Sequence, residues 1–199
     1  MRTDVFAAMA AFCFVSGVTP GPNNLMLMTS GVNFGFRRTL PHLMGVVVGF
    51  CLMVALVGLG LDAIFARFPA LLPAMRYLGA AYMLWLAGKI AFAGPAPEGE
   101  SRGTPLGFFG AAAFQWINPK AWVIALSALT AYSVVDDYTR NVLIVALAYL
   151  AIGLPSSGSW ALLGSAMRRA LGDPRIARPF NLTMALLLVA SIVPVFCEG

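Results

Sequence analysis

The sequence predicts an all-α integral membrane protein, with six transmembrane helices arranged as two inverted three-helix repeats. The composition, the spacing of the charges and two proline-containing interruptions of apolar segments all indicate this fold. The 199 residues are 60% hydrophobic and 11% charged, with a net charge of +5 and a mean hydropathy of +0.83. Soluble domains are about 45–50% apolar and about 25% charged. Because a water-soluble domain of this size cannot bury so much apolar surface, the composition excludes a soluble enzyme and a disordered chain.

The charged residues set the limits of the expected helices. A hydrocarbon core about 30 Å thick requires about 20 apolar helical residues. Four segments carry no charge and are long enough for one crossing each, namely 5–36, 39–61, 141–167 and 179–197. Two further apolar segments contain Lys120, or have Arg76 and Lys89 near their ends, where long cationic side chains reach the interface. We expect helices at residues 5–29, 40–62, 70–92, 106–131, 141–165 and 178–197.

One polar linker divides this single domain of residues 1–199. Residues 94–105 read GPAPEGESRGTP, which no helix can cross, and they separate half-repeats at about 1–93 and 106–199. Lys and Arg are enriched in cytoplasmic loops. Eight of them fall in the first, third and fifth loops and four in the other loops and tails. We therefore expect the linker in the cytoplasm, both termini outside, and the first apolar run retained rather than cleaved as a signal peptide.

The remaining charges and the cysteines argue against other partners and cofactors. The positive charge is scattered rather than gathered in a basic patch, so no nucleic-acid partner is expected. The expected partner of the chain is the lipid bilayer. Cys13, Cys51 and Cys197 are widely spaced in apolar segments and form no CxxC pair. They indicate neither a disulfide framework nor a redox centre. No cluster of His, Cys and carboxylates suggests a metal site, and we expect no cofactor.

Proline interrupts the first and fourth expected helices. Residues 19–24 read TPGPNN and residues 118–120 read NPK, with Pro20 and Pro119 lying 99 residues apart. Proline removes a backbone donor, and polar groups freed in lipid must find partners inside the protein. The freed carbonyls and the asparagine amides are therefore expected to form a polar site. An amino acid would bind there with its carboxylate at the amide end of a half-helix and its ammonium at the freed carbonyls. The alternative is a proline kink packed by small residues. The candidate substrate-binding and translocation residues are Pro20, Gly21, Pro22, Asn23, Asn24, Asn118, Pro119 and Lys120.

Lys120 is the one charge deep within a hydrophobic segment. A cation at the centre of a bilayer is costly, so such residues usually face a cavity or a partner. We expect Lys120 to face a cavity; the alternative is a lysine that snorkels or caps the carbonyls freed by Pro119. Gln115, Trp116 and Trp122 surround it and receive no role.

Other residues of the apolar segments have mainly structural interpretations. His42 is expected at the membrane interface rather than as a proton carrier. Gly45 and Gly49 have the GxxxG spacing of close helix packing, and residues 79–81 (GAA) are interpreted in the same way. Residues 155–157 (PSS) break the fifth expected helix and either border the polar site or only kink the helix.

Four sequence motifs resemble the LysE/RhtB family of amino-acid exporters. They are TPGPNN at 19–24, GFRR at 35–38, GAAY at 79–82 and NPKAW at 118–122, so the resemblance spans nearly the whole chain. It implies secondary-active export, driven by the proton motive force, across the bacterial cytoplasmic membrane. The implied substrates are homoserine, threonine, lysine or cysteine-pathway compounds, and a homodimer is expected. Pro20 to Asn23 and Asn118 to Lys120 then belong to the translocation region, and GFRRTLPH to a cytoplasmic loop before the second helix.

Two other classes of function stay open at this stage. A passive channel or permease for small polar metabolites also requires a hydrated polar site. An intramembrane enzyme is less favoured, because the chain lacks a pair of membrane-embedded aspartates, and its one histidine adjoins a loop. No Asp or Glu lies in the middle of an expected helix. Proton coupling would therefore use Lys120, His42, Asp62 or the ammonium of the substrate.

Overall fold

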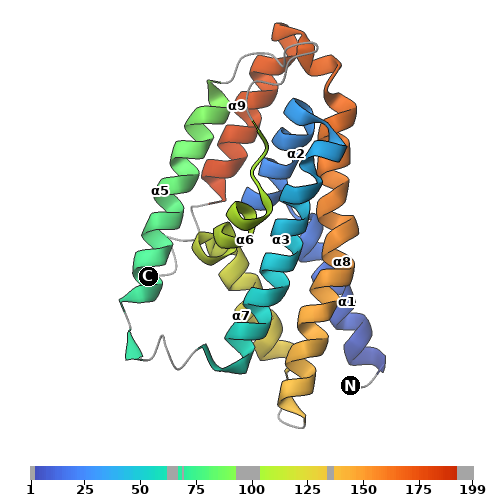
Figure 1. Cartoon of the computed structure of the whole chain (residues 1–199), viewed down its shortest axis with the longest axis vertical. Coiled ribbons are helices and arrows are strands. Elements are labelled where there is room, and N and C mark those ends of the chain that lie inside the picture. Colours follow the sequence, from blue (N-terminus) through green and yellow to red (C-terminus); the bar gives the residue numbers. More distant parts are fainter. Residues whose placement is uncertain (1–2, 62–66, 69, 93–103, 134–136, 192–199) are drawn as a thin grey trace.

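The computed structural model describes residues 3–61, 67–68, 70–92, 104–133 and 137–191, which form helices and no strand (Figure 1). The elements are α1 (Thr3–Val18), α2 (Pro22–Phe34), α3 (Phe36–Leu56), the π-helical turn η1 (Val57–Leu61), α5 (Leu71–Ala91), α6 (Phe108–Ile117), α7 (Pro119–Tyr132), α8 (Tyr138–Met167), the 3₁₀ turn η2 (Ala170–Gly172) and α9 (Pro174–Ala190). Every segment in which the sequence predicts a helix contains one. The all-α class is therefore confirmed.

Helix length and hydropathy identify membrane-spanning elements directly. The segments Phe36–Gly60 and Tyr138–Met167, of 25 and 30 residues with mean hydropathies of 2.5 and 1.8, are long and apolar enough to cross a bilayer. Helices α1 and α2 meet the same requirement as a pair, although they are bent by 54° relative to one another. The described residues therefore hold two spans, or three with the bent pair. The arrangement of six crossings in two inverted repeats stays a prediction.

The outward faces of the helices carry large apolar side chains. Several of these side chains on α5, α8 and α9 expose more than half of their surface, for example those of Leu78, Trp85, Leu162, Leu182 and Leu186. In water such a surface would be costly, whereas lipid tails solvate it. The exposed apolar faces therefore agree with a membrane protein.

Two predicted helices are each divided into two. The segment predicted as one helix at 5–29 forms α1 and α2, because Pro20 and Pro22 lack the donors that a continuous helix needs. The segment predicted at 106–131 forms α6 and α7, which meet at Asn118 immediately before Pro119. Both breaks are where the sequence places these two interruptions. The break predicted at residues 155–157 is wrong, because α8 continues through Pro155 from Tyr138 to Met167.

Two helices begin four residues before the predicted position. Helix α3 begins at Phe36 rather than at residue 40, so most of the expected GFRRTLPH loop is helical. Gly35 makes the turn between α2 and α3 alone, with φ of 77°, a conformation that glycine adopts without strain. Helix α9 begins at Pro174 rather than at 178, because the Asp173 side chain accepts a hydrogen bond from the backbone amide of Arg175 at 2.8 Å. Residues 192–197 of the predicted sixth helix lie outside the described residues.

Glycines allow the helix backbones to contact one another. A Cβ atom at Gly45 would meet the backbone of Phe108, and one at Gly49 would lie 2.5 Å from the Cα of Ala112. The predicted packing role of this GxxxG pair is thus confirmed for the contact between α3 and α6. A Cβ at Gly79 would overlap the carbonyl oxygen of Ile117, so α5 packs directly against the end of α6.

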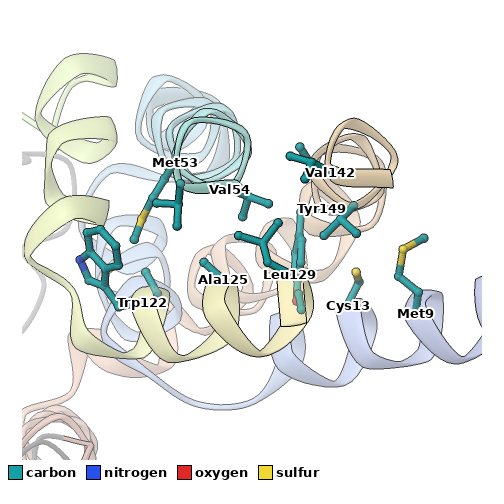
Figure 2. Packing of buried hydrophobic residues seen from close by; sticks show 14 residues of the cluster. Met9, Cys13, Met53, Val54, Trp122, Ala125, Leu129, Val142 and Tyr149 are labelled. Atoms are coloured by element: carbon teal, nitrogen blue, oxygen red, sulfur yellow. The ribbon is translucent and has the colours of Figure 1, made fainter. Parts of the chain in front are cut away.

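A buried cluster of apolar side chains joins α1, α3, α7 and α8. Figure 2 labels its members Met9, Cys13, Met53, Val54, Trp122, Ala125, Leu129, Val142 and Tyr149. In the picture the side chains of α7 face those of α3 and α8, while those of α1 approach from the side. The packing holds the start of α7, and with it Lys120, close to the break between α1 and α2.

Candidate functional site

The first break lies between Val18, the last residue of α1, and Pro22, the first of α2. Gly21 is the N-cap residue in extended conformation, with no side chain to cap the first amides of α2. The Thr19 hydroxyl donates to the Val15 carbonyl at 2.5 Å. Among the described residues, no side chain therefore caps the positive end of the α2 dipole.

Side chains of the protein satisfy the carbonyls freed at this break. The Asn24 amide donates to the carbonyl of Gly17 at 2.6 Å and to that of Thr19 at 3.0 Å. The indole N–H of Trp160 in α8 donates to the Val18 carbonyl at 3.2 Å. Because each acceptor has a donor from within the protein, the interruption is stabilised away from lipid. Such specific pairing exceeds what a simple proline kink requires.

The second break is capped by its own asparagine. The Asn118 side chain is 1% exposed and accepts a hydrogen bond from the backbone amide of Lys120 at 3.2 Å. The indole N–H of Trp122 donates to the carbonyl of Trp116 at 2.8 Å, across the same break. The N-terminus of α7 is thus closed locally, whereas that of α2 is not.

Lys120 joins the two breaks. Its Nζ atom donates to the carbonyl of Thr19 at 2.7 Å and to the carbonyl of Pro20 at 3.1 Å. The lysine therefore caps carbonyls of the first break, not those freed by Pro119. A Cβ atom at Gly21 would lie 2.6 Å from Cδ of Lys120 and 2.9 Å from Nζ. Glycine is required at this position for the lysine to reach its acceptors.

A second link joins Asn23 of α2 to Gln115 of α6. The Asn23 amide donates to Oε1 of Gln115 at 2.8 Å, and the Gln115 amide donates to Oδ1 of Asn23 at 3.2 Å. Gln115 is fully buried and also donates to the Ala111 carbonyl at 2.9 Å. Sequence reasoning assigned Gln115 no role. Its position in an apolar helix, three residues before the break at Asn118, is the signal that could have found it.

These elements enclose a cavity between α1, α2, α3, α7 and α8. The space open to water is about 70 Å³, against the ~10–15 Å³ that one buried water requires. The cavity is lined by Ser16, Gly17, Gly21, Pro22, Asn23, Asn24, Val46, Val47, Phe50, Asn118, Lys120, Ala121, Ile124, Tyr149, Gly153 and Ser157. Six of the eight candidate residues line it. Pro20 and Pro119 do not, although the Pro20 carbonyl accepts from Lys120.

Polar and apolar side chains both line the cavity. The hydroxyls of Ser16 and Tyr149 lie 3.4 Å apart, and Ser157 adds a third hydroxyl. Of the residues 155–157, Ser157 lines the cavity and Pro155 does not. Valine and phenylalanine side chains of α3, with Ala121 and Ile124 of α7, add apolar surface to the lining. The site suits a small molecule with one polar end and a short side chain.

The charge in the cavity is unbalanced. Lys120 is the one charged side chain that lines it, and no carboxylate does so among the described residues. The uncapped N-terminus of α2 adds partial positive charge beside it. An anionic group is therefore the chemical complement of the site.

His42 differs from its expected place at the membrane interface. Its side chain is 2% exposed, and neither ring nitrogen has a hydrogen-bond partner among the described residues. The histidine is buried because Gly35 starts α3 early, which carries residue 42 into the packed part of the helix. It does not line the cavity. Asp62 lies outside the described residues.

Comparison with known proteins finds relatives of nearly the whole chain. The LysE type translocator model matches residues 14–192. The chain is 32% identical to the cysteine/O-acetylserine efflux protein of Salmonella typhimurium (strain LT2) and 31% identical to that of Escherichia coli (strain K12). Each similarity extends over 198 residues, which is 98% of this chain and 100% of the relative. No solved structure matches this chain.

The broken helices and the polar cavity between them define a membrane transporter rather than an enzyme. The chain belongs to the LysE type translocator family, since the family model covers most of its length. The resemblance that the four sequence motifs indicate is therefore confirmed.

Proposed function

We propose that this protein exports a small amino acid with a short polar side chain, of the cysteine and O-acetylserine class, across the bacterial cytoplasmic membrane. The observation that carries the proposal is the Lys120 ammonium, which lines the cavity and has no carboxylate partner among the described residues. The carboxylate of an amino acid supplies the missing negative charge and can also accept from the free amides of α2.

The size and lining of the cavity support this substrate class over the others that the sequence left open. The hydroxyls of Ser16, Tyr149 and Ser157 offer partners for a short polar side chain. Lysine is disfavoured, because its second ammonium would enter a cavity whose one charged group is Lys120. The names of the efflux relatives in Salmonella and Escherichia coli agree with cysteine and O-acetylserine.

The proposed topology has six crossings in two inverted halves. Each half contributes one helix that is broken by proline, α1–α2 in the first and α6–α7 in the second. Such paired interruptions are the usual place of the substrate in inverted-repeat transporters. We propose that residues 94–105 lie in the cytoplasm and both termini lie outside, in accord with the distribution of Lys and Arg.

We further propose that export is secondary-active and driven by the proton motive force. The test uses inside-out membrane vesicles, in which an exporter accumulates substrate. Vesicles with the protein should concentrate radiolabelled L-cysteine above the external level when energised, and a protonophore should abolish the accumulation. Equilibration to equal concentrations would instead indicate a passive channel. Uptake no greater than in vesicles without the protein, for L-cysteine and for O-acetyl-L-serine, would overturn the proposal.

A further inference from the structure

The acceptors of the Lys120 ammonium are of the kind that an amino-acid substrate also needs. A protonated α-amino group and a lysine side chain both end in an ammonium with three N–H donors. In the structure the carbonyls of Thr19 and Pro20 accept two such bonds from Lys120, at 2.7 and 3.1 Å. The place for a substrate ammonium at the broken helix is therefore occupied by a side chain of the protein.

The other freed carbonyls have donors that are fixed in the fold. The Gly17 carbonyl accepts from Asn24, the third residue of α2, which is 5% exposed and also donates to the Thr19 carbonyl, and the Val18 carbonyl accepts from the indole of Trp160 in α8. Lys120 instead reaches its acceptors with a long aliphatic side chain that borders the cavity. It is the donor that can leave without unfolding a helix.

A zwitterion can replace the lysine without leaving a polar group unpaired. A carboxylate is a stronger acceptor for an ammonium than a peptide carbonyl, because both partners are then charged. Once the carboxylate attracts Lys120, the substrate ammonium can donate to Thr19 and Pro20 in its place. Each carbonyl keeps a donor and the net charge of the cavity is unchanged, so the desolvation cost of an unpaired group is avoided.

We propose that Lys120 occupies the binding site of the substrate ammonium when no substrate is bound. Its ammonium then donates to the carbonyls of Thr19 and Pro20. When the substrate binds, Lys120 leaves these carbonyls to the substrate ammonium and donates to the substrate carboxylate instead. This inference rests on the proposed function and names Lys120 as the residue that makes the site require both a carboxylate and an amine. The exchange also releases the direct bond between α7 and the first break. Substrate binding is thereby coupled to the freedom of the two broken helices to move.

The test measures binding of two ligands to purified protein in detergent by isothermal titration calorimetry. L-cysteine carries both charged groups, whereas L-cysteine methyl ester keeps the ammonium and lacks the carboxylate. The variants are Lys120→Met, which removes the charge and shortens the side chain by one atom, and the matched control Lys89→Met. Lys89 lies on α5, over the ring of Trp85 at 4.6 Å, and does not line the cavity.

The exchange predicts opposite effects on the two ligands. In the wild type the ester should bind at least about tenfold more weakly than L-cysteine, since it cannot draw the lysine away from its acceptors. In Lys120→Met the affinity for L-cysteine should fall by about tenfold and that for the ester should rise by about tenfold, because the Pro20 carbonyl then has no lysine donor and the Thr19 carbonyl keeps only its bond from Asn24. Lys89→Met should behave as the wild type.

Each other outcome contradicts a distinct part of the account. If Lys120→Met binds L-cysteine more weakly but binds the ester as the wild type does, Lys120 is a partner of the substrate carboxylate that does not occupy the ammonium site. This result would overturn the proposed exchange. An equal loss of both ligands, or no change in their ratio, would reduce Lys120 to a structural cap. If the wild type binds neither L-cysteine nor O-acetyl-L-serine, the proposed function itself fails.

Discussion

The side-chain amides of Asn23 and Gln115, which are 92 residues apart in sequence, donate hydrogen bonds to one another at 2.8 and 3.2 Å. Together with the bond from Lys120 to Thr19, this pair connects the broken helix of the first half to that of the second. Both links lie at or next to the cavity. The two halves therefore meet through polar contacts that a substrate can compete for, rather than through apolar packing alone.

Loss of one member of this amide pair should destabilise the protein. Gln115→Leu leaves the Asn23 amide without its partner, and an unpaired polar group in a packed interior costs about 1–3 kcal/mol. The double variant Asn23→Leu/Gln115→Leu should lose less than the sum of the two single variants. Thermal unfolding of the purified proteins measures the coupling. Strictly additive losses would show that the two amides do not interact in the membrane.

Gly21→Ala should abolish export while the protein still accumulates in the membrane. The new Cβ atom would lie 2.6 Å from Cδ of Lys120, and the flexible lysine moves away more easily than the backbone. The backbone at Gly21 is extended, a conformation that alanine adopts freely. Gly107→Ala is the matched control, because Gly107 is also an N-cap residue but a Cβ there meets nothing within 4 Å. Export that is equally unaffected in both variants would contradict the need for Lys120 at the break.

Gly79→Ala should lower the amount of folded protein. The Cβ atom of the new alanine would overlap the carbonyl oxygen of Ile117, a backbone atom that cannot move without shifting α6. Overpacking of this kind lowers the free energy of unfolding by about 1–3 kcal/mol. Gly88→Ala on the same helix meets nothing within 4 Å and should be neutral or slightly stabilising. Membrane abundance and thermal unfolding of the two variants check the difference. A Gly79 variant as stable as the Gly88 variant would argue against the contact between α5 and the end of α6.

The orientation is tested by labelling single cysteines placed within residues 94–105, in a variant that lacks Cys13, Cys51 and Cys197. An impermeant thiol reagent should label them only after the membrane is permeabilised, because the distribution of Lys and Arg places this linker in the cytoplasm. Labelling in intact cells would reverse the assigned topology.

Local chemistry made the breaks predictable from the sequence, because proline acts on its own helix. TPGPNN and NPK therefore indicated both the interruptions and most of the residues that line the cavity. The partner of Lys120 could not be predicted from the sequence, which left open whether Lys120 faces a cavity or caps the carbonyls near Pro119. It does line the cavity, but its acceptors are carbonyls 100 and 101 residues away.

Tertiary contacts account for what the sequence did not indicate. The position of Gln115 in an apolar helix close to the Asn118 break indicates a polar partner, but only the fold shows that this partner is Asn23. The burial of His42 depends on where α3 begins, which the positive φ of Gly35 determines. Helix ends that depend on one capping side chain, such as Asp173, also escaped a prediction based on charge spacing.

The most direct test of the central claim is the export rate per molecule of Lys120→Met, measured together with its membrane abundance and compared with Lys89→Met. We expect Lys120→Met to insert at the wild-type level or above, because a charge within an apolar segment has been removed, and to export no substrate. Lys89→Met should insert and export as the wild type does. An unchanged flux per molecule in Lys120→Met would contradict the assignment of the site between the two broken helices.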